Sequence, residues 1–520
     1  MEGSRRDAII IGGGHNGLVA AFYLARAGLR VTVLERRDFV GGACATEELF
    51  EGYRVSSCSY VCWMLQSKVI EDMQLRRRGF EYKVLDPIQF NPYQDGSHLF
   101  YWMDDDRTQE ELRRLNEHDA QNYTEYNKFW SRAAGLVNHF LLKDPPTLAE
   151  VMDYAREQGE EELLEWLLTH SVADVCDAYF EDARIKASLV QIEDIGDPWA
   201  PGSAWTEAYF HCSEFTDLGG YAVVKGGMGT ITASMADACR EQGVDLRTGA
   251  EVEEILVDDG RVRGVRLASR EEMEADLVLS NADPKRTFLR LVDRHSLPGP
   301  FRTRVENLST KTSYLKFHAI MDRLPDTSRY LGREPKPEEI SYIHIAPSLE
   351  HYRQAYEEIR DGEPASEPIV HIQIPSVYDT TLTDRDGHIV SIWALYAPPK
   401  LTRGTWEEHR EEVGNALVDY VAEFVPNFRK DMREWMLFTP ADIEQRVGLT
   451  DGNIRHLDVL PGQFMSQRPI PGAGYSTPIE GLYLCGSGTH PAGEVSGAPG
   501  HNAAHAVLRE VEAKAKKVAL

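Results

Sequence analysis

The pattern of apolar and polar positions at the start of the chain predicts a strand, a turn, a helix and a second strand. Residues 8–11 form a short apolar run, which is typical of a central parallel strand buried on both faces. Apolar residues then recur at helical spacing from Leu18 to Ala25, and Gly28 ends the helix. A second apolar run over 31–34 predicts the next strand. This order predicts a Rossmann-like α/β unit.

The turn between the first strand and the helix reads Gly-Gly-Gly-His-Asn-Gly, which fits the pattern G-x-G-x-x-G. Gly12 permits the tight turn, Gly14 lets a pyrophosphate approach the backbone, and Gly17 lets helix and strand pack closely. The helix N-terminus offers free N–H groups and a positive dipole end to the phosphates. We expect Asn16, just before the last glycine, to contact the same ligand.

An acidic residue ends the second strand. Glu35 would accept hydrogen bonds from a ribose hydroxyl, and its negative charge disfavours a 2′-phosphate. Arg36, next to it, is a further candidate contact. Strand, glycine turn, helix and acid together predict a dinucleotide site; the alternative is a plain βαβ unit with a glycine-rich turn.

A second glycine pair, Gly41-Gly42, follows the acid. Here the chain resembles the FAD-binding flavoprotein amine oxidase and phytoene desaturase superfamily, in which such a pair runs along the cofactor pyrophosphate. Many members have arginine next, where this chain has Ala43, so one contact to phosphate must come from elsewhere. The resemblance implies FAD as the cofactor rather than NAD.

Another glycine-rich stretch lies near the end of the chain. Residues 482–485 predict a strand that opens into glycines, and an alanine-rich helix follows. The stretch resembles the C-terminal signature of phytoene-desaturase-like flavoproteins, which covers the ribityl chain and the flavin edge. That likeness implies Gly486 on the pyrophosphate side, and the helix start at Gly497 and Ala498 beside the flavin. It also implies that the strand beginning near Val252 lies against adenine.

The same resemblance implies an α/β protein, α+β overall, with a discontinuous, Rossmann-like FAD-binding domain of the glutathione-reductase type. We assign residues 1–86, 218–300 and 456–520 to that domain. Residues 87–217 and 301–455 remain for a substrate-binding domain, a mixed sheet with a helical insertion.

Periodicity in the substrate half predicts helices first and strands later. Residues 106–130 and 148–168 have the pattern of charged amphipathic helices, with a Pro-Pro break between them. Apolar and polar residues alternate over 370–374, and 389–393 is a second apolar run, so both predict strands of a sheet beneath a pocket.

Aromatic residues are concentrated around the start of the second FAD-domain segment. They predict an aromatic-lined substrate tunnel, as implied by family members that bind long lipophilic molecules, or ordinary core packing; both interpretations stay open. The aromatic residues are Trp199, Trp205, Tyr209, Phe210, Phe215 and Tyr221.

The sequence offers candidates for catalysis, each with a structural alternative. His490, Glu494 and His501 flank the flavin edge that the resemblance implies, and each could move a proton or orient substrate. Tyr60 follows a strand that family members carry past the isoalloxazine, so it is a candidate to face substrate. A role in packing is the alternative for all four.

Most of the chain, from about residue 7 to 511, resembles one subgroup named for a pyridine nucleotide-disulfide oxidoreductase domain. This sequence supports neither part of that name, because no second G-x-G-x-x-G follows a strand and no C-x-x-C occurs. We therefore expect FAD as the only tightly bound dinucleotide, with oxygen, a quinone or another carrier as electron acceptor. The subgroup's motifs include Lys225-Gly-Gly-Met-Gly, Leu279-Ser-Asn281, Leu437-Phe-Thr-Pro-Ala-Asp442 and Cys485-Gly-Ser-Gly488.

The amino-acid composition limits the kinds of binding partner that we expect. The 520 residues carry 56 Lys and Arg against 83 Asp and Glu, a net charge of -27, which argues against nucleic acid; a peripheral membrane contact would need a local basic patch. No metal-ligand pattern joins the 7 cysteines to histidine, so we expect no metal. The absence of a signal segment, a transmembrane run or a disulfide pattern favours a cytoplasmic protein, and the chain length leaves a homodimer open.

These features favour an FAD-dependent oxidoreductase of the desaturase or dehydrogenase type. The resemblance implies a lipophilic, unsaturated organic substrate and hydride transfer from a substrate carbon to flavin N5. A redox-neutral flavin isomerase or a saturase would share the fold and the cofactor contacts, so the sequence leaves that alternative open. An FAD-stabilised interaction protein with little turnover is a further alternative.

Overall fold

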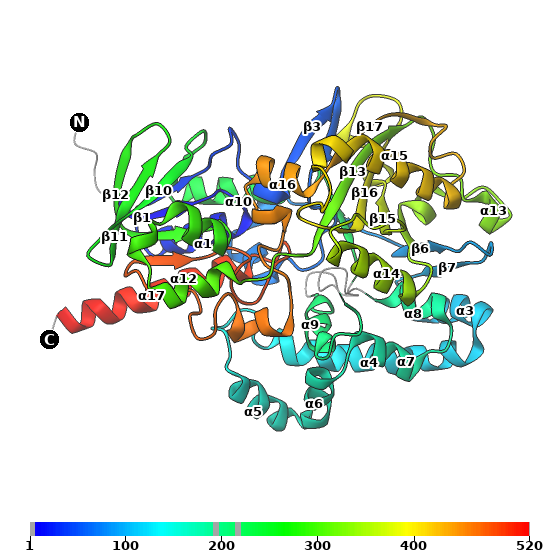
Figure 1. Ribbon diagram of the computed structural model, residues 1–520, viewed down its shortest axis with the longest axis horizontal. Helices are drawn as coiled ribbons and strands as arrows, with labels where there is room; N and C mark the ends of the chain where they lie inside the picture. The colour runs from blue at the N-terminus through cyan, green and yellow to red at the C-terminus, as the bar shows by residue number, and fades with distance from the viewer. Residues whose placement is uncertain (1–5, 191–196, 214–219, 519–520) are drawn as a thin grey trace.

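The computed structural model describes residues 6–190, 197–213 and 220–518. Figure 1 shows one sheet with its helices on the left, a second sheet at the upper right, and a layer of helices along the lower edge. Within the described ranges, every helix falls short of the length or the apolar character that crossing a membrane requires.

The first sheet is parallel at its centre. β1 (Arg6–Ile11) pairs in parallel with β2 (Val31–Leu34) and with β12 (Glu272–Ser280). β9 (Asp245–Arg247) pairs with β2, and β18 (Leu482–Leu484) with β12, again in parallel. Early, middle and late parts of the chain therefore share one sheet, and the predicted Rossmann-like α/β fold is confirmed. An antiparallel hairpin extends it beyond β12: β10 (Val252–Asp258) and β11 (Arg261–Leu267).

Three helices cover one face of this sheet. The predicted first helix is α1 (His15–Arg26), which packs against α10 (Gly229–Glu241) and α17 (Ala498–Val518). Residues 16–24 of α1 are all buried, because the helix lies between the sheet and its two neighbours. That burial fits the small and apolar residues along α1 and fixes its N-terminus at the end of β1.

The second sheet is built mainly from antiparallel strands of the substrate half. All residues of β13 (Ser313–Met321) are buried, since helix α15 (Trp406–Phe424) and its cluster cover one face and the molecule's interior lies on the other. The predicted strands over 370–374 and 389–393 are β15 and β16. The sheet order is β17 (Met432–Phe438), β13, β16 (His388–Ala397), β15 (Ile369–Gln373), β14 (Tyr342–Ile345), β6 (Gln89–Pro92) and β7 (His98–Tyr101).

The two long helices expected in the insertion are each divided in two. Asn116 ends α3 in an extended conformation, and its side chain caps α4 by accepting from the amide of Asp119 at 3.1 Å. Gly159 ends α5 in the left-handed conformation that glycine favours. The helices are α3 (Asp105–Leu115), α4 (Glu117–Asn138), α5 (Leu148–Gln158), α6 (Glu161–Thr169), α7 (Val172–Tyr179), α8 (Ala183–Leu189) and α9 (Ser203–Phe210).

Shorter elements connect these layers. Two small antiparallel ribbons and several further helices complete the described chain. They are β3 (Thr46–Phe50) with β4 (Tyr53–Ser56), β5 (Tyr82–Val84) with β8 (Ala222–Val224), α2 (Ser67–Asp72), α11 (Pro284–Arg286), α12 (Gly299–Glu306), α13 (Ser328–Leu331), α14 (Leu349–Arg360) and α16 (Pro440–Val447).

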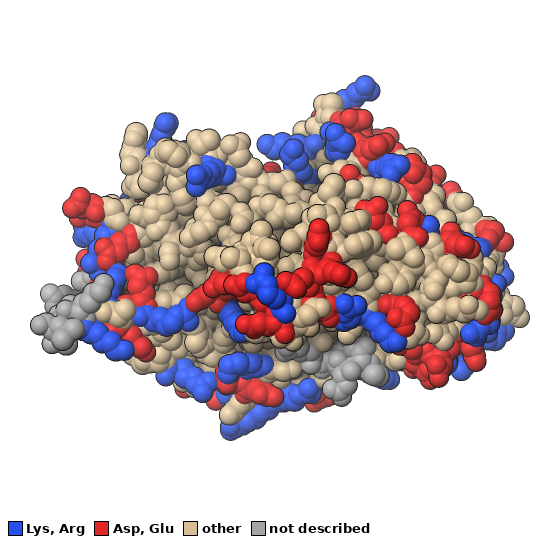
Figure 2. Space-filling model, turned by 90° about the horizontal axis from the view of Figure 1, so that it is seen from below, with Lys and Arg blue, Asp and Glu red and all other residues tan. Residues whose placement is uncertain are grey.

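Charged side chains are mixed on the face seen from below. Figure 2 shows lysines and arginines interspersed with aspartates and glutamates across that face. Despite the net charge of -27, both signs are therefore present on this surface.

Candidate active site

A first cavity opens where β1 ends and α1 begins. Its empty volume is about 890 Å³, and its walls come from the turn after β1, the end of β2, the start of β10 and the loop after β18. Such a crevice at the carboxyl ends of parallel strands is where open α/β sheets bind ligands. The predicted residues that line it are Gly12, Gly14, Asn16, Glu35, Arg36, Gly42 and Val252.

Glycine is required at this crevice because two turns touch through their backbones. A Cβ on Gly17 would lie 2.2 Å from the carbonyl oxygen of Gly12. A Cβ on Gly42 would lie 3.3 Å from the Cα of Gly14, and the amide of Gly41 donates to the carbonyl of Gly13 at 2.9 Å. The backbone of both turns is thus left open to an anionic ligand.

Glu35 closes the same turn from the second strand. Its Oε2 accepts from the amide of Gly13 at 2.8 Å, and its Oε1 accepts from the amide of Arg37 at 2.9 Å. Each carboxylate oxygen has a further acceptor position, so the buried group can also bind a ribose hydroxyl. Glu35 therefore shapes the glycine turn as well as lining the cavity, a structural contribution that the sequence did not indicate.

Buried polar atoms around the first cavity test whether the residues fit FAD. Five side-chain atoms in its wall have no hydrogen-bond partner within the part of the chain that the structure describes. Such atoms are rare in protein interiors, and here a phosphate and hydroxyl-rich ligand would satisfy them. They are His15 Nε2, Asn16 Oδ1, Arg36 Nε, Arg286 Nε and His456 Nδ1.

Two arginines line the same cavity, in which Ala43 offers no charge. Arg36 and Arg286 bring two guanidinium groups to the cavity, where many relatives would have an arginine after the glycine pair. Burial lowers the pKa of His15 to about 4 and that of His456 to about 3, so both imidazoles are neutral at neutral pH. The residues present fit an FAD molecule.

The other predicted cofactor residues stand behind the cavity walls. A Cβ on Gly486 would lie 2.7 Å from His456 Cε1, so this glycine lets the wall residue His456 approach. Gly497 has a φ of 74° and ends the loop before α17, whose first residue is Ala498. Gly17, Gly41, Gly486, Gly497 and Ala498 line neither this cavity nor the next one.

A second cavity adjoins the first between the two sheets. Its empty volume is about 780 Å³, and His15, Ala43 and Ile454 line both cavities. Aromatic side chains dominate its wall, with a few polar groups among them, which is typical of a small-molecule pocket. The aromatic residues are Tyr60, Trp63, Phe210, Tyr221 and Trp393, and the charged ones are Arg455 and Glu494.

The structure brings two of the four catalytic candidates to this second cavity. Tyr60 and Glu494 line it. His490 is fully buried and its Nε2 lies 2.9 Å from the carbonyl of Phe140. His501 lies on α17, where Asn502 contacts its Nδ1 at 2.8 Å. Burial lowers the pKa of both histidines to about 4, and neither lines either cavity, so a catalytic role for them stays a prediction.

The aromatic residues singled out in the sequence divide between pocket and core. Phe210 and Tyr221 line the second cavity, where Trp63 stacks on Phe210 at a centroid distance of 6.2 Å. Trp205 and Tyr209 instead pack in the core against Phe464. Trp199 lies under the guanidinium of Arg353. Phe215 lies outside the described residues.

Sequence reasoning missed a buried lysine behind the second cavity. Lys316 on β13 has no exposed surface, and its Nζ has no hydrogen-bond partner among residues 6–190, 197–213 and 220–518. The Nζ lies 4.6 Å from the ring centroid of Tyr60 and 5.3 Å from that of Trp393. Burial lowers the pKa of Lys316 to about 7. A single lysine within the apolar run Tyr-Leu-Lys-Phe was the available signal.

Polar groups also follow β14 and β15 toward the same wall. The hydroxyl of Tyr60 lies 3.5 Å from that of Tyr342, which lies 2.9 Å from Nδ1 of His371. Gln373 donates from its Nε2 to the carbonyl of Tyr60 at 2.7 Å. The alternating polar residues of β15 thus fix Tyr60 rather than face solvent.

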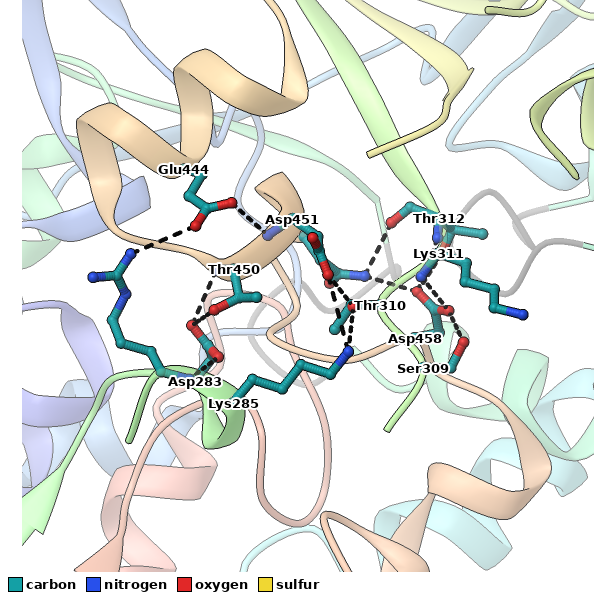
Figure 3. A network of polar contacts seen from close by, with 12 residues as sticks. Asp283, Lys285, Ser309, Thr310, Lys311, Thr312, Glu444, Thr450, Asp451 and Asp458 are labelled. Carbon is teal, nitrogen blue, oxygen red and sulfur yellow. Dashed lines mark hydrogen bonds and ion pairs between the residues drawn. The ribbon is translucent and has the colours of Figure 1, made fainter. Parts of the chain in front are cut away.

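A network of carboxylates holds the segment that carries Arg455 (Figure 3). Asp458 accepts from Asn453 Nδ2 at 2.8 Å, from Thr312 Oγ1 at 2.6 Å and from Ser309 Oγ at 2.6 Å. These bonds tie the segment 453–456 to the chain entering β13. The segment therefore reaches both cavities from a rigid support.

A second buried carboxylate in Figure 3 joins the same region to the first sheet. Asp283, just after β12, accepts from the amide and the hydroxyl of Thr450 at 3.0 and 2.9 Å. Burial raises the pKa of Asp283. Asp283 thus joins the end of β12, in the first sheet, to the segment that follows α16.

The cysteines near the second cavity are poor nucleophiles. Cys44 lines it, and burial raises the pKa of its thiol to about 12. Burial also raises the pKa of Cys58 to about 11. Neither is a thiolate at neutral pH, which is the form that would react with a flavin or an oxidant.

Comparison with known proteins supplies the family. The sequence matches the flavin containing amine oxidoreductase family over residues 17–344. It is 32% identical to the pyridine nucleotide-disulfide oxidoreductase domain-containing protein 2 of Rattus norvegicus, over 97% of this chain and 94% of that one. It is 25% identical to a phytoene desaturase (neurosporene-forming) of Cereibacter sphaeroides, over 95% and 92%.

Solved structures show the same fold. A variant of putrescine oxidase redesigned at its cofactor site has a TM-score of 0.64 at 16% identity, covering 98% of this chain and 99% of that one. The resemblance to the amine oxidase and phytoene desaturase superfamily is confirmed. FAD is the cofactor, and the activity class is that of an FAD-dependent oxidoreductase. The chain belongs to the flavin-containing amine oxidoreductase family.

Proposed function

We propose that the chain is a dehydrogenase of the desaturase type that oxidises a lipophilic organic substrate, with hydride passing from a substrate carbon to flavin N5. The observation that carries this proposal is the aromatic second cavity, which shares wall residues with the dinucleotide cavity. A substrate there would be shielded from water and next to the cofactor. The phytoene desaturase relative, whose name gives a lipophilic substrate, supports the same class.

We further propose which residues hold the cofactor. Gly12, Gly14 and Gly42 expose backbone to the pyrophosphate, and Glu35 binds the adenosine ribose. His15, which lines both cavities, would contact the part of the cofactor between them. When bound, FAD supplies the two-electron acceptor of the reaction.

The domain assignment belongs to this proposal. Residues 1–86, 218–300 and 456–520 would form the FAD-binding domain, since they supply every strand of the first sheet. Residues 87–217 and 301–455 would form the substrate-binding domain, and they supply every strand of the second sheet. Tyr60 comes from the first group and Trp393 from the second, so the second cavity would lie between the two domains.

The test is a spectrum followed by an anaerobic titration. Purified protein should show flavin absorption bands, and a panel of lipophilic alkenes, alcohols and amines should include a class that bleaches them. Bleaching by one class would name the chemistry. A bound flavin that no member bleaches would favour the redox-neutral isomerase or the interaction protein instead, and protein without flavin after reconstitution would overturn the proposal.

A further inference from the structure

We infer that the substrate of the second cavity carries an uncharged oxygen function, a hydroxyl or a carbonyl group, which the Arg455–Glu494 pair binds. This inference rests on the proposed function and specifies its substrate class. A purely hydrocarbon substrate, which the aromatic walls alone would suit, offers no group for this pair to bind.

The pair is the charged part of an otherwise aromatic wall. Arg455 Nη2 and Glu494 Oε1 form an ion pair, and both side chains line the second cavity. Their side chains are only 9% and 14% exposed. Arg455 Nη1 also donates to the hydroxyl of Tyr314 at 2.6 Å. The guanidinium carbon lies 5.6 Å from the ring centroid of Phe210, so the charge faces the same space as the aromatic side chains.

Stability alone does not explain a buried ion pair at this place. Taking two charges out of water is costly, and well-packed apolar residues of similar volume are often as stable or more so. Both residues are nevertheless held firmly. The amide of Arg455 donates to Asn453 Oδ1 at 3.0 Å, its carbonyl accepts from Arg468 Nη2 at 2.6 Å, and Glu494 has a φ of 67°. A left-handed conformation costs free energy at a residue other than glycine, so the surrounding structure holds Glu494 in place.

The arrangement selects among polar groups. A hydroxyl group can accept a hydrogen bond from the guanidinium of Arg455 while donating its own to the carboxylate of Glu494, and a carbonyl oxygen can accept from Arg455. Because Arg455 and Glu494 neutralise each other, the pair has no net charge. A protonated amine is attracted by Glu494 but repelled by Arg455, and a substrate carboxylate is attracted by Arg455 but repelled by Glu494, so neither charged group gains a net attraction. A hydroxyl group therefore bonds to both members of the pair, and a carbonyl group bonds to Arg455 without adding a charge.

The experiment compares ligands that differ in one functional group. Flavin-loaded wild-type protein is titrated with menthane, menthol, menthone and menthylamine, and with dodecane, dodecanol, dodecanone and dodecylamine, while the flavin spectrum is recorded. In at least one series the oxygenated probes should bind about ten-fold more tightly than the hydrocarbon and the amine. Three outcomes would overturn the inference. All probes could bind with equal affinity, a hydrocarbon or an amine could bind most tightly, or no oxygenated probe could bind.

Two variants assign the preference to the pair. Arg455→Met should bring the affinities of alcohol and hydrocarbon to within about two-fold of each other. Glu494→Gln keeps the side-chain shape but removes the charge that repels a carboxylate. It should therefore raise the affinity for dodecanoate about ten-fold. This variant still tests the inference if Arg455→Met does not fold. Arg156→Met, which breaks an exposed ion pair on α5, is the matched control and should change neither ratio. Unchanged ratios in both cavity variants would contradict the role of the pair.

The same titrations separate this inference from the proposed function. If oxygenated probes shift the flavin spectrum but no compound bleaches it anaerobically, the proposed dehydrogenase activity is contradicted and the inferred binding preference still holds. Bleaching by hydrocarbons that bind as tightly as their alcohols would support the dehydrogenase and overturn the oxygen preference.

Discussion

The two cavities are adjacent, yet they are built in different ways. The first takes its shape from backbone: two glycine turns in contact, a carboxylate that accepts from main-chain amides, and the start of α1. The second takes its shape from side chains that come from the loop before α2, from α9 and from the second sheet. Contacts to a constant ligand part, the diphosphate, suit backbone groups, whereas a particular substrate is recognised by side chains.

The comparison teaches where sensitivity to mutation should lie. At Gly17 the backbone leaves no room for a Cβ, so the first cavity should fail completely when this glycine is replaced. Side-chain sites should respond in graded steps, with binding changed before folding is lost.

The largest effect is expected for Gly17→Val. Its Cβ would lie 2.2 Å from the carbonyl oxygen of Gly12, so α1 could not pack on β1 and the turn would open. We expect loss of bound flavin, measured as the flavin-to-protein absorbance ratio after purification with added FAD. Gly299→Ala, where an added Cβ meets nothing within 4 Å, should keep the wild-type ratio. If the Gly17→Val protein kept its full flavin content, the first cavity would not depend on its backbone in the way described above.

Asp458→Ala should have the next largest effect. It would strip the buried partners Ser309, Thr312 and Asn453 of their shared acceptor, at about 3–5 kcal/mol of unfolding free energy. Urea denaturation measures the change. Asp419→Ala, at an exposed pair with Arg429, should change stability by less than about 1 kcal/mol. If both variants were equally stable, the Asp458 network would not support the cavities.

Lys316→Met should stabilise the protein at neutral pH. The folded-state pKa of Lys316 is about 7, below its ordinary value of 10.5, so between these pH values the unfolded chain binds more protons and stability rises with pH. The penalty is largest below pH 7 and vanishes above about 10.5. Removing it should add about 2–4 kcal/mol at pH 7.

Urea denaturation of wild type and Lys316→Met across pH 6–10 checks this. The difference between the two proteins should shrink as the pH rises, because the wild-type penalty is lost. A variant less stable than wild type at every pH would show that the lysine stabilises the second cavity instead.

Glu35→Ala should weaken FAD binding by about 1.5–3 kcal/mol, since the ribose loses a charged acceptor and the amide of Gly13 loses its partner. The flavin retained after equilibrium dialysis at a series of FAD concentrations gives the dissociation constant. Asp38→Ala, three residues on and exposed, is the control and should retain flavin as the wild type does. If the two variants retained flavin equally well, Glu35 would not contribute to FAD binding.

The smallest expected effect is that of NADH on the absorption of the bound flavin. The chain has one glycine turn of the dinucleotide-binding kind and no second G-x-G-x-x-G after a strand. Anaerobic NADH should therefore leave the flavin bands in place over minutes. Rapid stoichiometric bleaching of the flavin by NADH would show that the protein binds a second nucleotide. The second cavity would then no longer differ from the first as a site for substrate alone.

The sequence by itself determined the dinucleotide half. The order of strand, glycine turn, helix and acid is local, because all four parts lie within residues 8–35 of the chain. This local pattern is enough to predict Gly12, Gly14 and Glu35 at a cofactor, and the second glycine pair adds the family resemblance.

Only the tertiary structure decided the second cavity. Tyr60, Trp393 and Arg455 are far apart in the sequence, and they meet because the second sheet and the segment 453–456 pack against the loop before α2. The same packing removed His490 and His501 from both cavities and buried Lys316 behind aromatic rings. Side-chain pockets depend on which distant surfaces come together, and burial then sets the charge of each group, so neither can be read from local pattern.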